Sequence, residues 1–540
     1  MQLLYLFGFF LALLSSLLLI PLLAKYASQL GLIDNPIGSE RKLHKAPMPR
    51  SGGLGIIIPT AIAILVVLPW NHSVLSFLLS SLVIVGFGLL DDIIELKPIQ
   101  KLIGQTLGVT FAMVGGMVIS DVPFIDNAPA WISYALTYVF VMAVINGVNF
   151  SDGMDGLAAG ITLMALVLIF LLAREGSVIH VAIIAAIISA ALVGFLHFNT
   201  HPAIIFMGDA GSQFLGFSVA WLAITVGEAE TLTLTSLMPL LILGIPIMDV
   251  LQVICVRIKK KLPLPGPDKE HLHHQIGKLG LPQAGVVATM YLLQLILLSG
   301  AFLIRQDSDA TALGFYICYL VAVLGVLYIG HAQGWRMKGA DTFDGVNRRN
   351  EIFRRVSFLH PYSGKFFGLV TAGLLCLFAV MSTEMPKGFI YIALLLATSI
   401  LCVKLVARGR WPLLIGRLST YTATIFCVYG MALSSSLRES FGIIDLFLAT
   451  LAMALVVSIR TTRKRYFWLT PHDLLVLFFV ILLAPSVSLD LGQNVNSGTL
   501  IFQTILLLYV SEYVLARGHV AQRRLTTAAL FSLFLLASNL

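Results

Sequence analysis

The sequence predicts an all-α protein that crosses a membrane many times, and three observations carry this prediction. The chain is 58% hydrophobic and only 11% charged, whereas soluble domains carry roughly 25% charged residues. Its apolar residues form runs of about 20, the length at which an α-helix crosses a hydrocarbon core about 30 Å thick. The Lys and Arg residues gather in alternate loops between these runs. Open sheets are excluded as spanning structures, because lipid offers a free strand edge no hydrogen-bond partner.

The apolar runs predict about 18 transmembrane helices. The first run has no basic segment before it, so we interpret it as a retained helix and not as a cleaved signal peptide. Eleven runs precede residue 340, near 3–24, 51–70, 73–90, 102–120, 131–149, 156–173, 178–197, 211–227, 233–256, 284–304 and 310–330. Seven follow it, near 366–381, 388–406, 418–434, 441–459, 470–488, 499–516 and 525–539.

The basic residues predict the orientation of these helices. If the N-terminus lies outside, 31 of the 35 Lys and Arg residues fall in loops on one side of the membrane. The positive-inside rule makes that side the cytoplasmic one. The net charge of +8 is then explained by topology, so it does not indicate a nucleic-acid partner. A basic inner surface would attract anionic lipid headgroups and phosphorylated substrates.

The chain divides into two predicted parts. Its polar motifs are confined to residues 1–280, and the longest hydrophilic inner loop after them spans 331–365. The spans beyond that loop contain almost no acids. We therefore expect one membrane domain over 1–339 and an additional membrane module over 340–540. The five cysteines lie within or at the ends of apolar runs without metal-ligand spacing, which is typical of small hydrophobic side chains.

Four polar stretches end or begin apolar runs, and all four are predicted on the cytoplasmic side. An ionisable group at a membrane edge is costly to move into hydrocarbon, so such clusters usually mark a functional site. Carboxylates and histidines beside basic loops suit a divalent cation and a phosphorylated substrate. The stretches are Asp91-Asp92, 146–156, 206–212 and 271–274.

The stretch 146–156 is the most specific signal. Asn146 and Asn149 lie three residues apart, on one helical face. Asp152 and Asp155 follow with the same spacing, and each precedes a glycine that lets the backbone turn sharply. Amide and carboxylate oxygens are hard ligands suited to Mg²⁺. A calcium loop is disfavoured, because the alternate acids and the terminal Glu of such a loop are missing.

The other stretches each admit a second interpretation. Adjacent carboxylates such as Asp91 and Asp92 raise each other's pKa unless a cation neutralises them, but they also occur at ordinary solvated helix ends. Asp209 at a helix start suits a metal or a bound anion, or is simply an N-cap. The histidines of 271–274 have basic neighbours and no accompanying cysteines, which favours phosphate over zinc. Asp249, within an apolar run, has no partner that the sequence reveals.

Together the stretches resemble the polyprenyl-phosphate N-acetylhexosamine-1-phosphate transferase family. The Asp-Asp pair, the Asn-x-x-Asn-x-x-Asp-Gly-x-Asp-Gly-Leu run, the Met-Gly-Asp-x-Gly-Ser run and the His-x-His-His stretch occur in that order. The resemblance covers about residues 1–330 and leaves 340–540 outside it. The Asp-x-x-His-Leu-His-His form at 268–274 is closer to the N-acetylglucosamine branch than to the muramoyl-pentapeptide branch, which remains the alternative.

The resemblance implies a reaction and a set of residue roles. A sugar 1-phosphate would move from a UDP-sugar to undecaprenyl phosphate with release of UMP, at the cytoplasmic face of the bacterial inner membrane. This would be the first membrane step of an O-antigen, common-antigen or teichoic-acid type of polysaccharide. The implied roles are catalysis by Asp91 and Asp92, Mg²⁺ (or Mn²⁺) binding by Asn149 and Asp209, and nucleotide and phosphate binding by Asp152, Asp155, Lys45, His271, His273 and His274.

Some questions stay open at this point. A transporter is disfavoured, because its acids would lie at the midplane between repeated halves, whereas here they lie at span ends and the halves do not repeat. A scaffold or flippase role stays open for residues 340–540. The sequence does not distinguish a monomer from a homodimer, one sugar from another, or a one-step reaction from one with a covalent intermediate.

Overall fold

A computed structural model describes residues 2–34, 47–261, 270–336, 360–381, 497–515 and 519–537, with scattered residues between 390 and 451. The described residues are mostly helical. The chain forms two compact units, one of Met1–Thr342 with Thr470–Leu475 and one of Phe343–Leu469 with Val476–Leu540. Lys45, one of the predicted site residues, lies outside the described residues.

The helices of the first unit follow the predicted apolar runs closely. Eight helices in the described part of the chain are long and apolar enough to cross a membrane. The total of about 18 spans and the outside N-terminus stay predictions. The helices of this unit are α1 (Gln2–Tyr26), α2 (Leu54–Val67), α3 (His72–Ile94), α4 (Pro98–Val114), α5 (Ala130–Ser151), α6 (Leu157–Glu175), α7 (Ile179–Asn199), α8 (Gly208–Gly227), α9 (Met238–Ile242), α10 (Gly244–Lys260), α11 (Leu272–Lys278), α12 (Gln283–Leu303) and α13 (Asp309–Ala332).

One predicted span differs from the structure. The run 233–256 was expected as a single helix, but it contains the short α9 and the longer α10, which meet at Leu243. Pro246 lies in the first turn of α10, where a missing N–H costs no intrahelical hydrogen bond. Hydropathy alone does not register such a break, because the residues on both sides of it are apolar.

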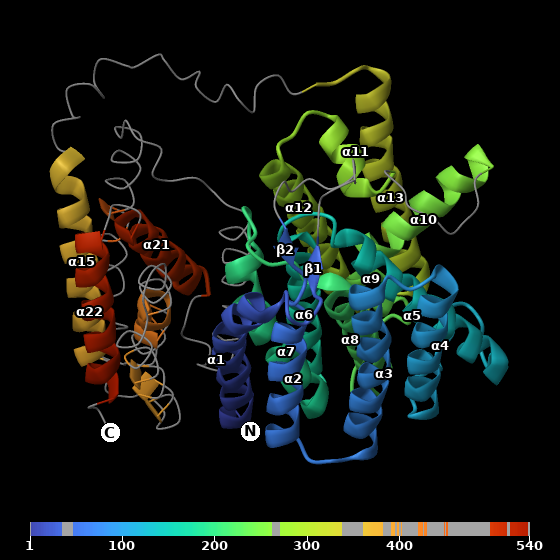
Figure 1. Ribbon diagram of the computed structural model, residues 1–540, viewed down its shortest axis with the longest axis horizontal. Helices are drawn as coiled ribbons and strands as arrows, with labels where there is room; N and C mark the ends of the chain where they lie inside the picture. The colour runs from blue at the N-terminus through green and yellow to red at the C-terminus, as the bar shows by residue number, and fades with distance from the viewer. Residues whose placement is uncertain are drawn as a thin grey trace. The chain divides into compact units, whose positions relative to one another are not determined.

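The core of this unit lies around α6, α7 and α8. In the most apolar segment of α8, 89% of the residues are buried, whereas in the corresponding segment of α13 only 17% are buried. α3 packs against α4 and α8, and α5 also packs against α8. α1 packs against α2, and Figure 1 shows the two-stranded ribbon β1–β2 near the upper ends of these two helices. α8 is therefore the central helix, and its first turn is fixed by several neighbours.

A backbone strap holds the start of α8. β1 (Ile33–Asp34) pairs antiparallel with β2 (Met48–Pro49), with Ile33 opposite Pro49. The chain after β2 then runs beside residues 206–207: the Phe206 N–H donates to Pro49 O at 2.8 Å, and the Gly53 N–H donates to Met207 O at 2.8 Å. These bonds set the position of the polar segment that begins α8.

In the second unit the structure describes three long helices, α15 (His360–Met381), α21 (Ser497–Leu515) and α22 (His519–Ala537), and α15 packs against both of the others. They fall on the predicted runs 366–381, 499–516 and 525–539. The runs 388–406, 418–434 and 441–459 are described only in part, and 470–488 lies outside the described residues. Buried hydroxyls here bond within their own helices, as Ser511 Oγ does to Leu507 O at 2.6 Å.

Candidate active site

Four helix ends bring polar side chains together in the first unit. Asp91 lies in the last turn of α3, Lys101 in the first turn of α4, Asn149 near the end of α5, and Asp209 in the first turn of α8. Lys101 Nζ lies 3.0 Å from Asp209 Oδ2 and also pairs with Asp91. Asn149 Nδ2 donates to Asp209 Oδ1 at 3.0 Å. Three of the predicted site residues therefore meet at one place.

Lys101 is the residue of this cluster to which sequence reasoning gave no role. The signal was present, because Lys101 lies in the short basic segment directly after the Asp-Asp pair. Its ammonium group lies between two carboxylates, and its side chain is 32% exposed against 3% for Asp91. A cation in this position offsets the repulsion between Asp91 and Asp209.

Asp92 makes contacts different from those of Asp91. Its two carboxylate oxygens accept the backbone N–H groups of Asp209 at 2.8 Å and of Ala210 at 3.0 Å. The first N–H groups of a helix have no partner inside the helix, and an acid near them is also favoured by the helix dipole. Asp92, on α3, thus caps α8 and fixes the backbone that carries Asp209.

Glycines allow α3 and α8 to approach this closely. A Cβ at Gly88 would lie 2.7 Å from Ala210 Cα, closer than real side chains come to a backbone. Gly208 has a φ of +74°, in the left-handed region that favours glycine, and a Cβ there would lie 2.7 Å from Asp92 Oδ2. Gly88 and Gly208 are therefore required by packing around the Asp92 cap.

A second polar layer lies one helical turn deeper, on the same three helices α4, α5 and α8. Gln105 Nε2 donates to Gln213 Oε1 at 3.2 Å, and Asn146 Nδ2 donates to Gln105 Oε1 at 3.1 Å. These three residues are one turn from Lys101, Asp209 and Asn149 respectively. The amide layer links the helices below the charged cluster, which holds the charged side chains in register.

The Asp-Gly turn after α5 is fixed on both sides. The Gly156 N–H donates to Asn199 Oδ1 at 2.9 Å, and the Tyr291 hydroxyl donates to Gly156 O at 2.7 Å. Asp155 Oδ2 accepts the Ala203 N–H at 3.1 Å and lies 2.8 Å from His201 Nδ1. The carboxyl of Asp155 is therefore anchored to the segment that leads into α8.

Asp152 lies at the start of this turn. Burial, together with the negative charges of Asp209 and Asp92, raises the pKa of the Asp152 carboxyl well above its usual value. The carboxylates of the cluster thus act on the acid at the start of the turn, in addition to its burial.

The histidine stretch covers the same region. The His271 ring packs against Phe150, with centroids 4.8 Å apart, and stacks on His273 at 5.8 Å. His273 lies close to the Asp-Gly turn, because a Cβ at Gly153 would be 3.0 Å from its Nε2. His274 is next to His273, with ring centroids 4.2 Å apart. Burial lowers the pKa of His273 to about 3, which keeps this ring neutral.

Asp249, whose partner the sequence did not reveal, lies on α10 and contacts the histidine stretch. Its Oδ2 lies 2.9 Å from His271 Nδ1, and its Oδ1 accepts the Leu272 N–H at 2.6 Å. The aspartate side chains at this site thus have two different roles, because some lie in the charged cluster and others hold neighbouring segments in place.

The donors fit a hard divalent cation. Mg²⁺ is commonly held by one or two carboxylates and completed by substrate phosphates and water. The Asp209 carboxylate is 27% exposed and lies beside the Asn149 amide and Asp91. Within the described residues, no three His, Cys, Asp or Glu side chains form a metal cage by themselves. This arrangement suits a cation that also takes ligands from a phosphorylated substrate.

The part of the chain that matches a known protein family contains the candidate site. The model of glycosyl transferase family 4 matches residues 74–227, the stretch from α3 to α8 that contains Asp91, Asn149 and Asp209. A probable undecaprenyl-phosphate N-acetylglucosaminyl 1-phosphate transferase of Bacillus subtilis (strain 168) is 34% identical over 323 residues, which is 58% of this chain and 88% of the relative.

Two further relatives show the same pattern. A decaprenyl-phosphate N-acetylglucosaminephosphotransferase of Mycobacterium tuberculosis (strain ATCC 25618 / H37Rv) is 32% identical over 342 residues, which is 55% of this chain and 83% of the relative. An undecaprenyl-phosphate alpha-N-acetylglucosaminyl 1-phosphate transferase of Escherichia coli (strain K12) is 28% identical over 277 residues, which is 49% of this chain and 75% of the relative.

Proposed function

The chain belongs to glycosyl transferase family 4, and we propose that it transfers N-acetylglucosamine 1-phosphate from a UDP-sugar to a polyprenyl phosphate and releases UMP. The observation that carries this proposal is the meeting of Asp91, Lys101, Asn149 and Asp209 at the ends of four helices. Such a cluster of hard oxygen donors and one ammonium group suits the transfer of a phosphoryl group between two anionic substrates.

The proposed reaction exchanges one bond at phosphorus. An oxygen of the lipid phosphate attacks the β-phosphorus of the UDP-sugar, and the bond from that phosphorus to the oxygen bridging to the α-phosphorus breaks. UMP leaves with the bridging oxygen, and a lipid diphosphate sugar remains. The protein has to align two anions and offset the charge that gathers between them.

We assign the residues as follows. Asn149 and Asp209 would hold Mg²⁺, which when bound neutralises the diphosphate and makes its phosphorus more electrophilic. Asp91 and Lys101 face Asp209, and they would orient the attacking lipid phosphate. Asp92 would keep the Asp209 backbone in place through its two backbone bonds.

The Asp-Gly turn and the histidines would hold the nucleotide part of the donor. Asp152 and Asp155 flank the anchored glycine turn, and His271, His273 and His274 lie over it. Lys45 precedes the strap that fixes α8 and is proposed as a phosphate contact. A site with both parts accounts for a donor that carries a nucleoside and two phosphates.

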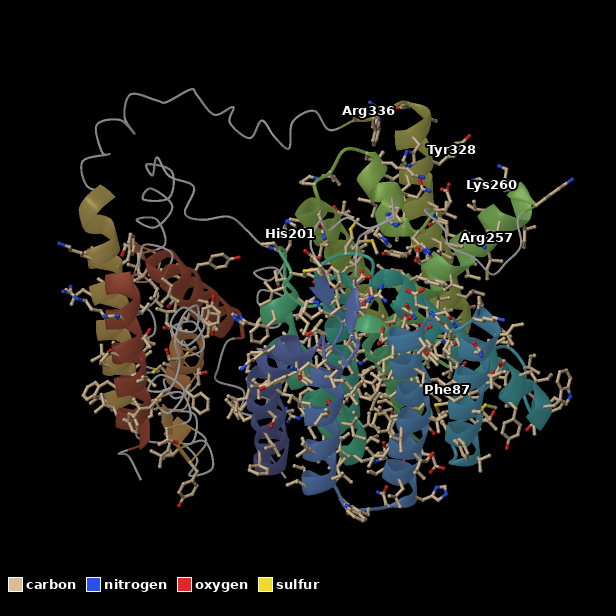
Figure 2. All side chains as sticks on the ribbon, in the orientation of Figure 1. Phe87, His201, Arg257, Lys260, Tyr328 and Arg336 are labelled. Carbon is tan, nitrogen blue, oxygen red and sulfur yellow. The ribbon has the colours of Figure 1, made fainter. Side chains whose placement is uncertain are left out.

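We further propose a plasma-membrane protein with an outside N-terminus and a site on the cytoplasmic face. In Figure 2 the labelled side chains of Arg257, Lys260 and Arg336 lie in the upper half of the first unit, and by the positive-inside rule such basic residues support a cytoplasmic placement of that half. Labelling of single cysteines placed near Asp92, Ser212 and His273 should occur from the cytoplasmic side only. Labelling of any of the three from outside contradicts this topology.

The function is tested with the purified full-length protein in detergent. UDP-N-acetylglucosamine, undecaprenyl phosphate and Mg²⁺ should yield UMP and a lipid-linked sugar diphosphate in equal amounts, and chelation of Mg²⁺ should stop the reaction. A panel with UDP-N-acetylgalactosamine and UDP-N-acetylmuramoyl-pentapeptide distinguishes the sugar. If only UDP-N-acetylmuramoyl-pentapeptide is turned over, the N-acetylglucosamine assignment is wrong. If no donor yields UMP, the proposed function is wrong.

We propose that the product begins a cell-envelope polysaccharide.

A further inference from the structure

Asp249 is a buried acid outside the charged cluster whose two oxygens both contact the histidine stretch. Asp249 is 2% exposed and His271 is 8% exposed. Asp249 Oδ2 lies 2.9 Å from His271 Nδ1, and Oδ1 accepts the Leu272 N–H at 2.6 Å. One carboxylate therefore fixes both the ring of His271 and the backbone at the start of α11.

The helix that carries Asp249 packs closely against α5. α10 crosses α5 so closely that a Cβ at Gly147 would lie 2.5 Å from Pro246 O, three residues before Asp249. α5 carries Asn149 in its last turn and ends at Ser151, directly before the Asp-Gly turn. The helix that carries a proposed metal ligand thus also sets the position of the acid that holds the histidines.

A carboxylate at one ring nitrogen determines what the other nitrogen does. An imidazole that donates its Nδ1–H to a carboxylate has an unprotonated Nε2 when neutral, and the same carboxylate stabilises the ring when it is doubly protonated. The His271 ring is also held from the side by Phe150 and by the stacked His273. Its orientation is therefore fixed from three directions.

From this geometry we propose that Asp249 is a positioning residue for the sugar-phosphate transfer: it sets the tautomer and the direction of His271 and holds α11 over the Asp152-Gly153 turn. The inference rests on the proposed function for its activity readout. Asp249 itself does not touch the substrate in this proposal; its effect on turnover passes through His271.

Asp249→Asn separates positioning from folding. The amide oxygen can still accept the Leu272 N–H, while the amide NH₂ donates to His271 Nδ1 and moves the ring proton to Nε2. The substitution keeps the shape and both hydrogen bonds but reverses the tautomer. Asp249→Ala, which removes both bonds, reports the structural contribution, and Asp249→Glu tests rescue by a carboxylate.

Asp309 provides a matched control. It also accepts a backbone N–H and side-chain hydrogen bonds at the start of a helix, from Ser236 N at 3.0 Å and Thr235 Oγ1 at 2.6 Å. None of these three residues belongs to the candidate site. Asp309→Asn should therefore lower the melting temperature in detergent without lowering the turnover of the folded enzyme.

The experiment measures UMP release, melting temperature and histidine tautomers in the full-length protein. Asp249→Asn should reduce kcat by about 10- to 100-fold, the usual effect of losing a residue that orients a functional imidazole. Its melting temperature should stay near that of the unmodified protein, and Asp249→Glu should recover part of the rate. In a His271→Gln background the same substitution should cause no further loss, because its effect passes through His271.

Nitrogen NMR of histidine-labelled protein reads the tautomer directly. The His271 signals, identified by their loss in His271→Gln, should report an Nδ1–H ring in the unmodified protein and an Nε2–H ring in Asp249→Asn. Unchanged turnover in Asp249→Asn, or an equal loss with and without His271, overturns the inference while the proposed function stands. If the unmodified protein releases no UMP, the proposed function fails, and a His271 ring that keeps its tautomer in Asp249→Asn then overturns the inference independently.

Discussion

Asp209 is the residue on which the candidate site converges, because side chains from three other helices meet its carboxylate and its backbone. Asn149 and Lys101 each donate a hydrogen bond to one carboxylate oxygen of Asp209, and the Asp92 carboxylate accepts the Asp209 backbone N–H. Displacing this carboxylate would therefore disturb the contacts of each of these neighbours. Substitutions at Asp209 and at the residues around it therefore have distinct expected effects.

Removing the Asp209 carboxylate should abolish transfer. Asp209→Ala deletes a proposed Mg²⁺ ligand, and the loss of several kcal/mol of charge stabilisation corresponds to a decrease of UMP release of about 10³-fold. Binding of Mn²⁺, followed by its paramagnetic resonance signal, should weaken in parallel. Asp126→Ala, at an exposed acid in the loop between α4 and α5, is the control and should leave both measurements unchanged. Near-normal UMP release from the Asp209 variant contradicts its assignment.

Asp92 is expected to act through the backbone of α8. An amide has a single acceptor oxygen, so in Asp92→Asn one of the Asp209 and Ala210 N–H groups loses its partner. A buried unsatisfied donor costs about 1–3 kcal/mol. The variant should lose thermal stability as well as turnover, whereas Asp91→Asn, which leaves the cap intact, should lose turnover with a smaller loss of stability. Equal melting temperatures for the unmodified protein and Asp92→Asn contradict the capping role.

His273 should make stability depend on pH. Burial lowers its pKa to about 3, below the value of about 6.5 for an unfolded histidine. Between these values the unfolded chain binds the extra proton, so stability is fully present above about pH 6.5 and falls by up to about 1.4 kcal/mol per pH unit below it. In His273→Gln the decline of the melting temperature from pH 7 to pH 5 should become shallower. His331→Gln, at an exposed histidine of α13, should keep the original slope, and an unchanged slope in His273→Gln excludes the effect.

At the scale of elements, the contact between α3 and α8 decides whether the site forms, and glycine makes it close enough. A Cβ at Gly88 would overlap the Ala210 backbone, whereas a Cβ at Gly86, on the same helix, would meet no neighbouring atom within 4 Å. The two glycines form a matched pair. They separate the effect of helix propensity from the effect of the helix–helix approach.

Gly88→Ala should therefore separate α3 from α8. The new methyl group would overlap Ala210 Cα, so either the helices move apart or the first turn of α8 shifts, and the cap by Asp92 is lost with it. We expect lower melting temperature and at least tenfold lower UMP release, since overpacking at backbone contacts costs about 1–3 kcal/mol and misplaces Asp209. Gly86→Ala should be neutral or slightly stabilising. If both variants behave alike, the close approach is not what positions the site.

The elements of the first unit were predictable because lipid imposes long apolar runs, and these show in the sequence without knowledge of contacts. The break at Leu243 was not predictable from hydropathy, because both of its sides are apolar. The partners of Asp92 and Asp249 were hidden for another reason. Asp92 contacts Asp209, 117 residues away, and Asp249 contacts His271, 22 residues away, so local sequence gives no sign of either pair. The residue types of the site were recognisable, but their division into cluster and support required the fold.

At the scale of the whole molecule, the chain consists of a unit that contains all described candidate site residues and a second unit that contains none of them. The relatives match about half of this chain, 49–58% in the three compared above. The described polar side chains of α15, α21 and α22 include hydroxyls that bond carbonyls one turn earlier in their own helices, a common arrangement for Ser and Thr inside helices. On these grounds we propose that the chemistry belongs to the first unit.

A truncation that ends near Gly339 should therefore retain sugar-phosphate transfer. Every contact described for the site, from the Asp92 cap to the pair of Asp249 and His271, joins residues before that point. The folded truncation, judged by its elution as a single species in detergent and by its melting transition, should release UMP and form lipid product at a rate close to that of the full chain. The same truncation with Asp209→Ala is the inactive control. A folded truncation that binds UDP-sugar but forms no lipid product would show that residues 340–540 contribute to the lipid site, because the donor half of the reaction would then be intact and the acceptor half missing.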